Sequence, residues 1–352
     1  MNISKVIVDL VDSGADVSDI LVESEAPIML KTSRGWREAE GVAVPSWSDI
    51  SAFLYDIDPG WELAIKCGAI NKPLGLQSHR LRVNAYLAFS GRKLMLSIRL
   101  IPVKPLTMGE AGLPAAARLM LESTNGLILI SGPTGSGKTT SMAAMVDVIN
   151  ETRNAHIITI EDPIEFVFER KKAVFSQREV GVDCEGFFDG VKDALRQRPD
   201  VVVIGEIRDR DTAEQAIIAG ESGHLVLGTL HAGSAAGTLS KLLGYFNAQE
   251  REGKLQSLAE NLVGITHQTL IPKKDGGYAL AVDFIANHKR QYSRVLGDPD
   301  KLQMSLDRNE DGVSIDLATS IKKLVQAGVV DKADALKAVV GNAVVYDKVR
   351  AL

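Results

Sequence analysis

A glycine-rich run at residues 132–139 has the composition and spacing of a phosphate-binding loop. It reads GPTGSGKT and matches the pattern G-x-x-x-x-G-K-[ST] at every position. Its glycines allow backbone N–H groups to converge on phosphate oxygens, and the helix that follows adds its positive dipole end. We expect Lys138 to reach the β- and γ-phosphates of ATP, and the Thr139 hydroxyl to bind Mg²⁺. The predicted nucleotide-binding residues are Gly132, Pro133, Thr134, Gly135, Ser136, Gly137, Lys138, Thr139 and Thr140.

Two groups of acidic residues each follow an apolar run. Residues 161–165 read EDPIE, and Gly205-Glu206 follows the run Val-Val-Val-Ile. Open α/β sheets bind ligands at the carboxyl ends of their strands. The second group is similar to a Walker B strand, with Glu206 serving the Mg²⁺ shell, partly through water. A hydrolase needs a further carboxylate to orient the attacking water, and the first group supplies it. Helix capping or surface salt bridges would also explain the first group, because motif matches carry false positives.

The elements that must position these residues are short apolar strands that alternate with helices. Two segments between the strands, 139–150 and 187–197, read as helices, and from about residue 234 onward the chain reads mostly helical. Short apolar runs with β-branched residues are typical of strands buried on both faces of a parallel sheet. The predicted strands are 126–131, 156–160, 201–204 and 224–230. This part of the chain therefore has the pattern of an α/β nucleotide-binding domain.

Residues 1–101 read as a separate, smaller α+β domain. Apolar residues recur on one helical face between Ile3 and Val11. The runs 81–89 and 94–100 are joined by Ser-Gly-Arg-Lys, which predicts a β-hairpin.

The domain boundary is predicted from proline and glycine content. These residues punctuate the segment 102–114, which we interpret as an interdomain linker. A chain of 352 residues also exceeds the size, about 250–300 residues, at which single cores usually stop growing. We therefore expect a second domain at residues 115–352.

Composition narrows the class of protein. The net charge of −5 argues against a general nucleic-acid binder, so no nucleic-acid partner is expected. No apolar run approaches the roughly 20 residues of a membrane span, so no direct membrane insertion is expected. Cys67 and Cys184 form no metal-binding spacing, and we interpret them as reduced packing residues of a cytosolic protein.

Four motifs in a fixed order resemble those of the secretion ATPase superfamily (GspE/PulE-like). They are similar to its Walker A motif, Asp box, Walker B motif and His box, at residues 132–139, 161–165, 205–209 and 222–231. Within the superfamily the chain most resembles type IV pilus retraction motors (PilT-like), over about residues 1–280. The resemblance implies a PAS-like N-terminal domain followed by a RecA-like P-loop ATPase domain with a helical C-terminal region.

The resemblance also implies roles for individual residues. Glu165, the last residue of the Asp box, would be the general base or water-positioning glutamate, and Glu206 would organise Mg²⁺. His231, and also His224, would sense the nucleotide state or link it to neighbouring elements. Without the resemblance, either histidine could equally be a strand-end residue that makes structural hydrogen bonds.

Arginines of the N-terminal domain would approach the phosphates, as the resemblance implies. The main candidates are Arg82 and Arg99, and Arg80 and Arg92 are additional ones. Alternation places Arg80 and Arg82 on one strand face, and a solvated strand edge would show the same pattern, because exposed arginines are common.

Members of this family act as homohexameric rings that hydrolyse ATP and transmit domain motion to a platform protein in the inner membrane. The resemblance thus implies a cytoplasmic ATPase, peripheral at the inner membrane through its partners, that drives pilus retraction.

Three alternatives accompany this reading. Residues 287–296 read NHKRQYSRVL where retraction motors usually carry AIRNLIRE, so the resemblance leaves room for an ATPase of type IVB secretion or conjugation (DotB-like). A small-molecule kinase would use the same loop but needs an acceptor pocket. A nucleic-acid translocase is disfavoured by the net charge and the absence of a basic stripe.

Overall fold

The structure is a computed structural model that describes residues 1–352 except 14–15, 77–78, 288 and 310. His288, part of the stretch that departs from the retraction motors, lies outside the described residues. The chain divides into two compact units. The first comprises Met1–Lys104 with Pro272–Tyr278, and the second comprises Pro105–Ile271 with Ala279–Leu352.

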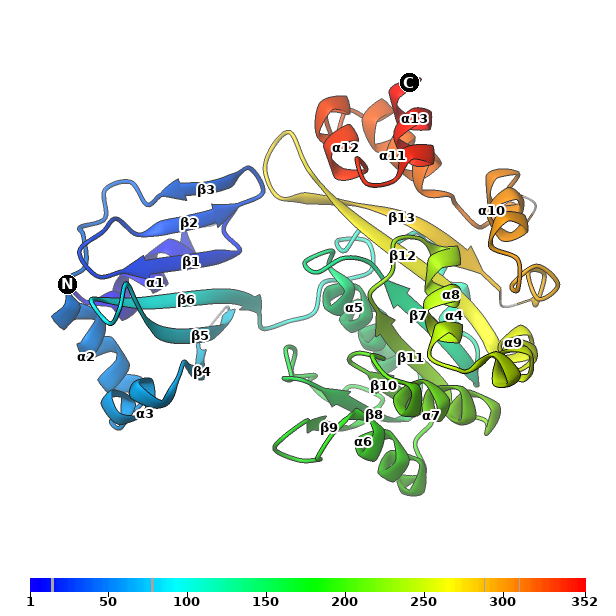
Figure 1. Ribbon diagram of the computed structural model, residues 1–352, viewed down its shortest axis with the longest axis horizontal. Helices are drawn as coiled ribbons and strands as arrows, with labels where there is room; N and C mark the ends of the chain where they lie inside the picture. The colour runs from blue at the N-terminus through cyan, green and yellow to red at the C-terminus, as the bar shows by residue number, and fades with distance from the viewer. Residues whose placement is uncertain (14–15, 77–78, 288, 310) are drawn as a thin grey trace. The chain divides into compact units, whose positions relative to one another are not determined.

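The first unit is built on a six-stranded antiparallel sheet in the order β3-β2-β1-β6-β5-β4 (Figure 1). The predicted hairpin is present as β5 and β6. Helix α1 begins at the cap residue Asn2, whose side chain accepts a hydrogen bond from Lys5 N, and it buries Ile3, Ile7 and Val11. The elements are α1 (Ile3–Asp12), β1 (Asp19–Glu23), β2 (Met29–Thr32), β3 (Gly35–Glu38), α2 (Trp47–Ile57), α3 (Trp61–Cys67), β4 (Ile70–Gly75), β5 (His79–Ala88) and β6 (Lys93–Pro102).

The interpretation of both cysteines as packing residues is wrong for Cys67. Helix α3 turns Trp61 and Ile65, four residues apart, toward the core, and Cys67 lies off that stripe and is exposed. Cys184 is half-buried, as expected for a packing residue.

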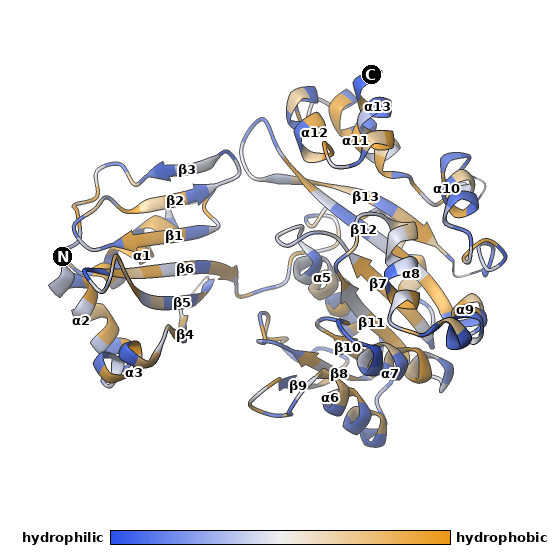
Figure 2. Cartoon of the chain, in the orientation of Figure 1, coloured by the Kyte–Doolittle hydropathy of each residue, from blue (hydrophilic) through white to orange (hydrophobic). Residues whose placement is uncertain are grey.

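The second unit contains a seven-stranded sheet in the order β13-β12-β7-β11-β10-β8-β9. From β12 to β9 in this order, each strand runs parallel to the next. Alternate residues of β7 enter opposite cores, Leu127 and Leu129 on one face and Ile128 and Ile130 on the other. The prediction of strands buried on both faces is therefore confirmed, and Figure 2 shows β7 and β8 coloured mainly as hydrophobic. The strands are β7 (Gly126–Ser131), β8 (His156–Glu161), β9 (Val174–Glu179), β10 (Val201–Ile204), β11 (Leu225–Leu230), β12 (Leu262–Pro272) and β13 (Tyr278–Ala286).

Helices cover both faces of this sheet. Helices α4 and α5 pack on one face, and α6 to α10 pack on the other. Helices α11, α12 and α13 form a further cluster with Ile271, Ala279 and Ala281 of the two last strands. The helices are α4 (Ala117–Leu121), α5 (Lys138–Thr152), α6 (Phe187–Ala194), α7 (Arg210–Glu221), α8 (Ala235–Gly244), α9 (Ala248–Asn261), α10 (Pro299–Asp307), α11 (Leu317–Gln326), α12 (Lys332–Ala338) and α13 (Ala343–Arg350), with a 3₁₀ turn at Leu195–Gln197.

The expectation of a mostly helical chain from residue 234 onward is wrong for residues 262–286. These residues form the long strands β12 and β13, joined by a short turn (Figure 1). Gly264 weakens the strand pattern of β12, but this position requires it. A Cβ there would lie 2.1 Å from Met120 Sδ and 2.6 Å from Ile285 O, so β12 passes too close to its neighbours for any larger residue. Among the described residues, no helix combines the length and apolarity needed to cross a bilayer.

Candidate active site

The phosphate-binding loop lies between the carboxyl end of β7 and the start of α5, as predicted. Gly137 precedes the helix with φ 84°, a left-handed conformation that favours glycine. A Cβ at Gly132 would lie 2.4 Å from Ser136 Oγ and 2.7 Å from Gln268 O, so a side chain there would fill the closed loop. Ser136 Oγ is buried and has no hydrogen-bond partner within the described part of the chain. A closed glycine loop with an unused buried hydroxyl fits a ligand rich in acceptor oxygens.

Lys138 is the first residue of α5 and is half-buried. Its Nζ donates hydrogen bonds to the carbonyl oxygens of Gly132 and Pro133, both at 2.9 Å, so the ammonium group stays at the mouth of the loop. Burial lowers the pKa of Lys138, whereas the nearby charge of Glu206 raises it. Lys138 and Glu206 are thus close enough to interact electrostatically. A nucleotide bound with its metal ion needs such a pair, a cation for the phosphates and a carboxylate for the metal.

Glu206 follows β10 and lies beside the loop that follows β11. Its Oε1 is 3.6 Å from Nε2 of His231, and its side chain is 34% exposed, so it remains open to solvent. The local backbone is fixed because Gly205 N donates to Ile160 O and Ile207 N donates to Thr229 O, both at 2.8 Å. The structure therefore brings Lys138, Glu206 and His231 together at the carboxyl edge of the parallel sheet.

The Asp box begins at the last residue of β8. Glu161 is buried, and its Oε1 accepts hydrogen bonds from Thr159 Oγ1 at 2.8 Å and Gln177 Nε2 at 3.3 Å. Burial raises the pKa of Glu161, and these hydrogen bonds lower it. Asp162 is exposed and forms an ion pair with Arg208 Nη2 at 3.2 Å, which links this box to the segment after β10. Glu165 is half-buried in the irregular segment that follows.

A small pocket separates the Asp box from α5. It is lined by Thr139 and Met142 of α5, by Thr159 and Glu161 of β8, and by Phe166, which follows the Asp box, among others. Thr139, the predicted Mg²⁺ ligand, thus lies on the same pocket as Glu161 of the Asp box.

The structure also identifies polar residues of β12 that sequence reasoning missed. His267 Nδ1 lies 3.3 Å from Ser131 Oγ, and Ser131 Oγ lies 2.6 Å from Thr238 Oγ1. Burial, followed by the charge of Lys138, lowers the pKa of His267 to about 4. Gln268 donates from Nε2 to Ser141 Oγ. The available signal was a run of four polar residues, Thr266 to Thr269, between apolar residues of β12, but this strand is not among those predicted from the sequence.

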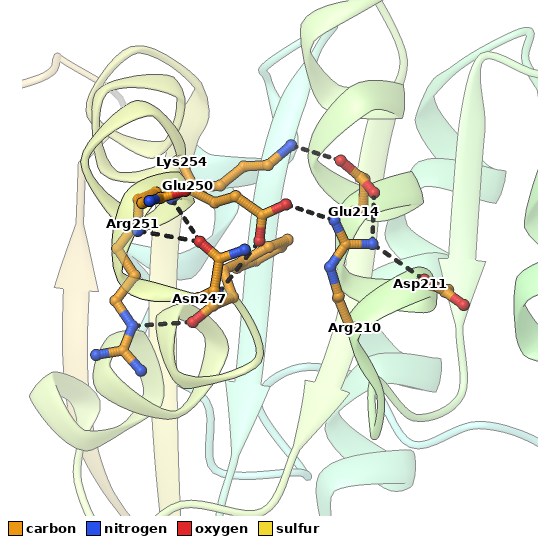
Figure 3. A network of polar contacts seen from close by, with 9 residues as sticks. Arg210, Asp211, Glu214, Asn247, Glu250, Arg251 and Lys254 are labelled. Carbon is orange, nitrogen blue, oxygen red and sulfur yellow. Dashed lines mark hydrogen bonds and ion pairs between the residues drawn. The ribbon is translucent and has the colours of Figure 1, made fainter.

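A charged network fixes the helix that follows the Walker B segment. Arg210 at the start of α7 contacts Glu250 of α9 at 2.6 Å and Glu214 at 3.2 Å, and Lys254 contacts Glu214 at 3.0 Å (Figure 3). The Arg210 guanidinium holds the pKa of Glu250 below its ordinary range. Exposed pairs of this kind contribute little stability one by one, so we attribute to the network a role in orienting α7 against α9.

His224 does not lie at this site. It precedes β11 at the amino end of the strand, whereas the phosphate-binding loop follows the carboxyl end of the neighbouring β7. Its Nδ1 is 3.1 Å from Ala219 O, so it makes the local hydrogen bond of a strand-end histidine. Within this chain His224 therefore lies at the opposite edge of the sheet from His231, and its role in sensing the nucleotide state or linking it to neighbouring elements stays a prediction.

The predicted arginines belong to the first unit. Arg82 of β5 and Arg99 of β6 are directly opposite in the ladder, and Arg99 Nε forms an ion pair with Asp19 at 3.0 Å. Arg80 is opposite Ile101, and Arg92 donates from Nε to Phe89 O in the β5–β6 turn at 3.2 Å. Their contact with phosphate stays a prediction.

Asp283 of β13 is a buried carboxylate that supports the start of α8. Its Oδ2 accepts a hydrogen bond from Ala235 N at 3.0 Å, and burial raises the pKa of Asp283 to about 6. The native state then binds more protons than the unfolded state between about pH 4 and pH 6, so this residue makes stability fall as pH rises through that range. Because of Asp283, the free energy of unfolding of the wild-type protein should fall by about 2–3 kcal/mol between pH 4 and pH 6. Asp283→Asn should abolish this fall, and denaturant unfolding at each pH measures it.

The quantity compared at each pH is the difference in free energy of unfolding between the wild-type protein and the Asp283→Asn variant. His267, with its lowered pKa, contributes in the same pH range with the opposite sign, and subtraction removes its contribution. A difference curve that is flat from pH 4 to pH 6 would show that Asp283 keeps an ordinary pKa.

Together, a strand–loop–helix phosphate cradle and carboxylates on two neighbouring strand ends define a P-loop nucleotide-binding protein. The profile of the Type II/IV secretion system protein family matches residues 74–295, and the chain belongs to this family.

Particular relatives place the chain among the pilus and secretion ATPases. It is 40% identical over 259 residues to the type IV pilus retraction ATPase PilT of Pseudomonas aeruginosa, covering 73% of this chain and 74% of that protein. The structure of the Legionella pneumophila ATPase DotB is similar with a TM-score of 0.85 and 25% identity, covering 96% of this chain and 95% of that one. The pilus retraction motor PilT with bound ADP gives a TM-score of 0.80 and 32% identity, covering 96% and 97%. The predicted resemblance and the predicted α/β fold class are confirmed.

Proposed function

We propose that the chain hydrolyses ATP with Mg²⁺ as a subunit of a homohexameric motor that drives type IV pilus retraction. The observation that carries this proposal is the convergence of Lys138, Glu206 and the Asp box at one edge of the sheet. This edge belongs to a chain that is 40% identical to a pilus retraction ATPase.

The residues at this edge fit Mg-ATP. The backbone of residues 132–139 and Lys138 would hold the phosphates, since the closed loop and the buried Ser136 hydroxyl suit acceptor oxygens. Thr139 and Glu206 would hold Mg²⁺, a hard cation that prefers oxygen ligands and keeps several waters. The bound ion would neutralise charge that develops on the phosphate oxygens.

Glu165 would accept a proton from the attacking water or orient that water toward the γ-phosphate. Its half-buried carboxylate lies in the segment that lines the pocket beside Thr139. Glu206 is engaged by Lys138 and His231, which suits it to the metal shell, and His231 would report the state of the nucleotide through this contact. Arg82 and Arg99 remain predicted phosphate contacts.

The proposed setting is cytoplasmic, at the inner membrane, where the ring would act on a membrane platform protein. The relatives named above are ATPases of pilus and secretion machines, and this supports the assignment.

Phosphate release by the purified full chain, combined with size-exclusion light scattering, tests the enzyme and the ring together. We expect slow hydrolysis of ATP that requires Mg²⁺ and stops with EDTA, in a particle near six chains. DNA or RNA should not stimulate the rate at low salt, where a translocase would respond most strongly. A monomer that binds ATP without releasing phosphate would contradict the proposal.

A type IVB secretion or conjugation ATPase is the second candidate, because DotB of Legionella pneumophila matches almost the whole chain with a TM-score of 0.85. Expression in a Pseudomonas aeruginosa strain that lacks its retraction ATPase separates the two. Only a retraction motor should restore twitching, whereas an intact ATPase without that effect would favour secretion.

A further inference from the structure

The segment that carries Glu165 is irregular, and its backbone groups bond to side chains. We define the Glu165 segment as residues 162–168, which follow β8 and belong to neither a helix nor a strand. A segment whose Phe166 is buried must still satisfy its backbone N–H and C=O groups. In a β-ladder those groups would pair with another backbone, which would fix them whatever the side chains were.

Two side chains of the edge strand β9 provide most of these bonds. Glu179 Oε2 accepts from Ile164 N at 3.1 Å. Gln177 accepts from Phe168 N at 3.1 Å through Oε1 and donates from Nε2 to Phe166 O at 2.8 Å. Gln177 and Glu179 are two residues apart and therefore lie on the same face of β9.

Glu161 completes the arrangement on the neighbouring strand. The backbone N–H of Glu165 faces this carboxylate and lowers its pKa, and Gln177 Nε2 donates to its Oε1 at 3.3 Å. One amide group therefore contacts both the Glu161 carboxylate and the backbone of Phe166 and Phe168, on either side of Val167. Thr159 adds a further donor to Glu161 at 2.8 Å.

The chain just beyond the Glu165 segment is held separately by α5. Asn150 Nδ2 donates to Glu169 O at 2.9 Å, and Asn150 Oδ1 accepts from Lys171 N at 3.1 Å. The stacked rings of Phe168 and Phe175, with centroids 4.8 Å apart, join the segment to β9 as well. A change at Gln177 would therefore shift the part around Glu165 without releasing the whole connection between β8 and β9.

We propose that Gln177 is a positioning residue for ATP hydrolysis: with Glu161 and Glu179 it holds the backbone that carries Glu165. This inference rests on the proposed role of Glu165. Gln177 does not contact the reacting atoms. It acts through the placement of one carboxylate, and a misplacement of about 1 Å can lower a rate by about 100-fold.

Gln177→Leu removes both polar atoms at similar size and tests the proposal. We expect kcat for ATP to fall about 10- to 100-fold, while the Kd for a fluorescent ATP analogue changes less than about twofold. ATP binding should persist because the hydrogen bonds of Gln177 go to Glu161, Phe166 and Phe168, and none of these residues belongs to the phosphate-binding loop. Gln256→Leu, the same substitution at an exposed position of α9, is the matched control and should keep wild-type kcat.

Glu179 gives an independent test that survives if Gln177→Leu does not fold. Glu179→Gln keeps an oxygen that can accept from Ile164 N, so kcat should remain within about threefold of wild type. Glu179→Ala removes that acceptor and should lower kcat about tenfold or more. Equal activity of the two variants would overturn the proposal.

The double variant Glu165→Gln/Gln177→Leu distinguishes positioning from general support of the fold. If Gln177 acts through Glu165, the double variant should be no slower than Glu165→Gln alone, because the group being positioned is already gone. Multiplicative losses would show that Gln177 acts elsewhere. Full hydrolysis by Glu165→Gln would refute the proposed role of Glu165. If Glu165→Gln loses hydrolysis but Gln177→Leu keeps wild-type kcat, only the positioning role of Gln177 is refuted.

Discussion

Glu165→Gln should lower kcat for ATP hydrolysis by about 10²- to 10⁴-fold, the usual contribution of a positioned general base. The amide keeps the size of the side chain but cannot take a proton from water. The phosphate-binding loop and Lys138 are untouched, so affinity for ATP should stay within about twofold of wild type. Single-turnover phosphate release, with nucleotide binding measured on the same samples, checks both expectations.

Glu169→Gln is the matched control for this experiment. Glu169 lies four residues further along the same connection, and its side chain is exposed, so wild-type hydrolysis is expected. If Glu165→Gln hydrolyses ATP at the wild-type rate while Glu206→Gln does not, catalysis belongs to the strand end of β10. That result would reassign the general base.

Lys138→Ala should weaken both ATP binding and hydrolysis. The half-buried ammonium is a cation in a loop that otherwise offers neutral N–H groups, and hydrogen bonds to charged groups are worth about 1.5–3 kcal/mol. That range corresponds to about a 10- to 100-fold loss of nucleotide affinity. Loss of a charge clamp on the transferring phosphoryl group should lower kcat by about 10²- to 10³-fold in addition. Isothermal calorimetry and phosphate release at saturating ATP separate these two effects.

Lys322→Ala, at an exposed position of α11, should leave both quantities unchanged. Lys138→Arg should not restore activity, because the planar guanidinium does not fit a pocket shaped for a compact ammonium group. Undiminished affinity in Lys138→Ala would mean that residues 132–139 are not the phosphate site.

The central strands and the phosphate-binding loop could be predicted because their signals are local. The runs at 126–131 and 201–204 are apolar at nearly every position, and the loop that follows β7 matches a full motif. The carboxylate that follows the run 201–204 was also expected at the carboxyl edge of the sheet, and Glu206 lies there because parallel strands align their carboxyl ends.

The parts that could not be predicted depend on contacts between distant residues. Strand β12 contains Gly264, His267 and Gln268, and its strand conformation follows from packing against Met120 and Ile285 far away in the sequence. The motif at residues 222–231 spans the whole of β11, so its two histidines lie at opposite edges of the sheet. Neither outcome can be read from periodicity alone.

Because side chains of β9 hold the Glu165 segment, the residues of β9 that make these bonds should tolerate few substitutions. Backbone ladders accept many side chains, because the bonding groups are common to all residues except proline. At Gln177 and Glu179 the bonding groups are the side chains themselves, so each position admits few alternatives although neither residue is expected to touch ATP. A saturation library selected for ATPase activity would thus find intolerant positions on an edge strand, where tolerance is normally greatest. In this chain the position of Glu165, the proposed catalytic carboxylate, therefore depends on the side chains of two strands and a loop.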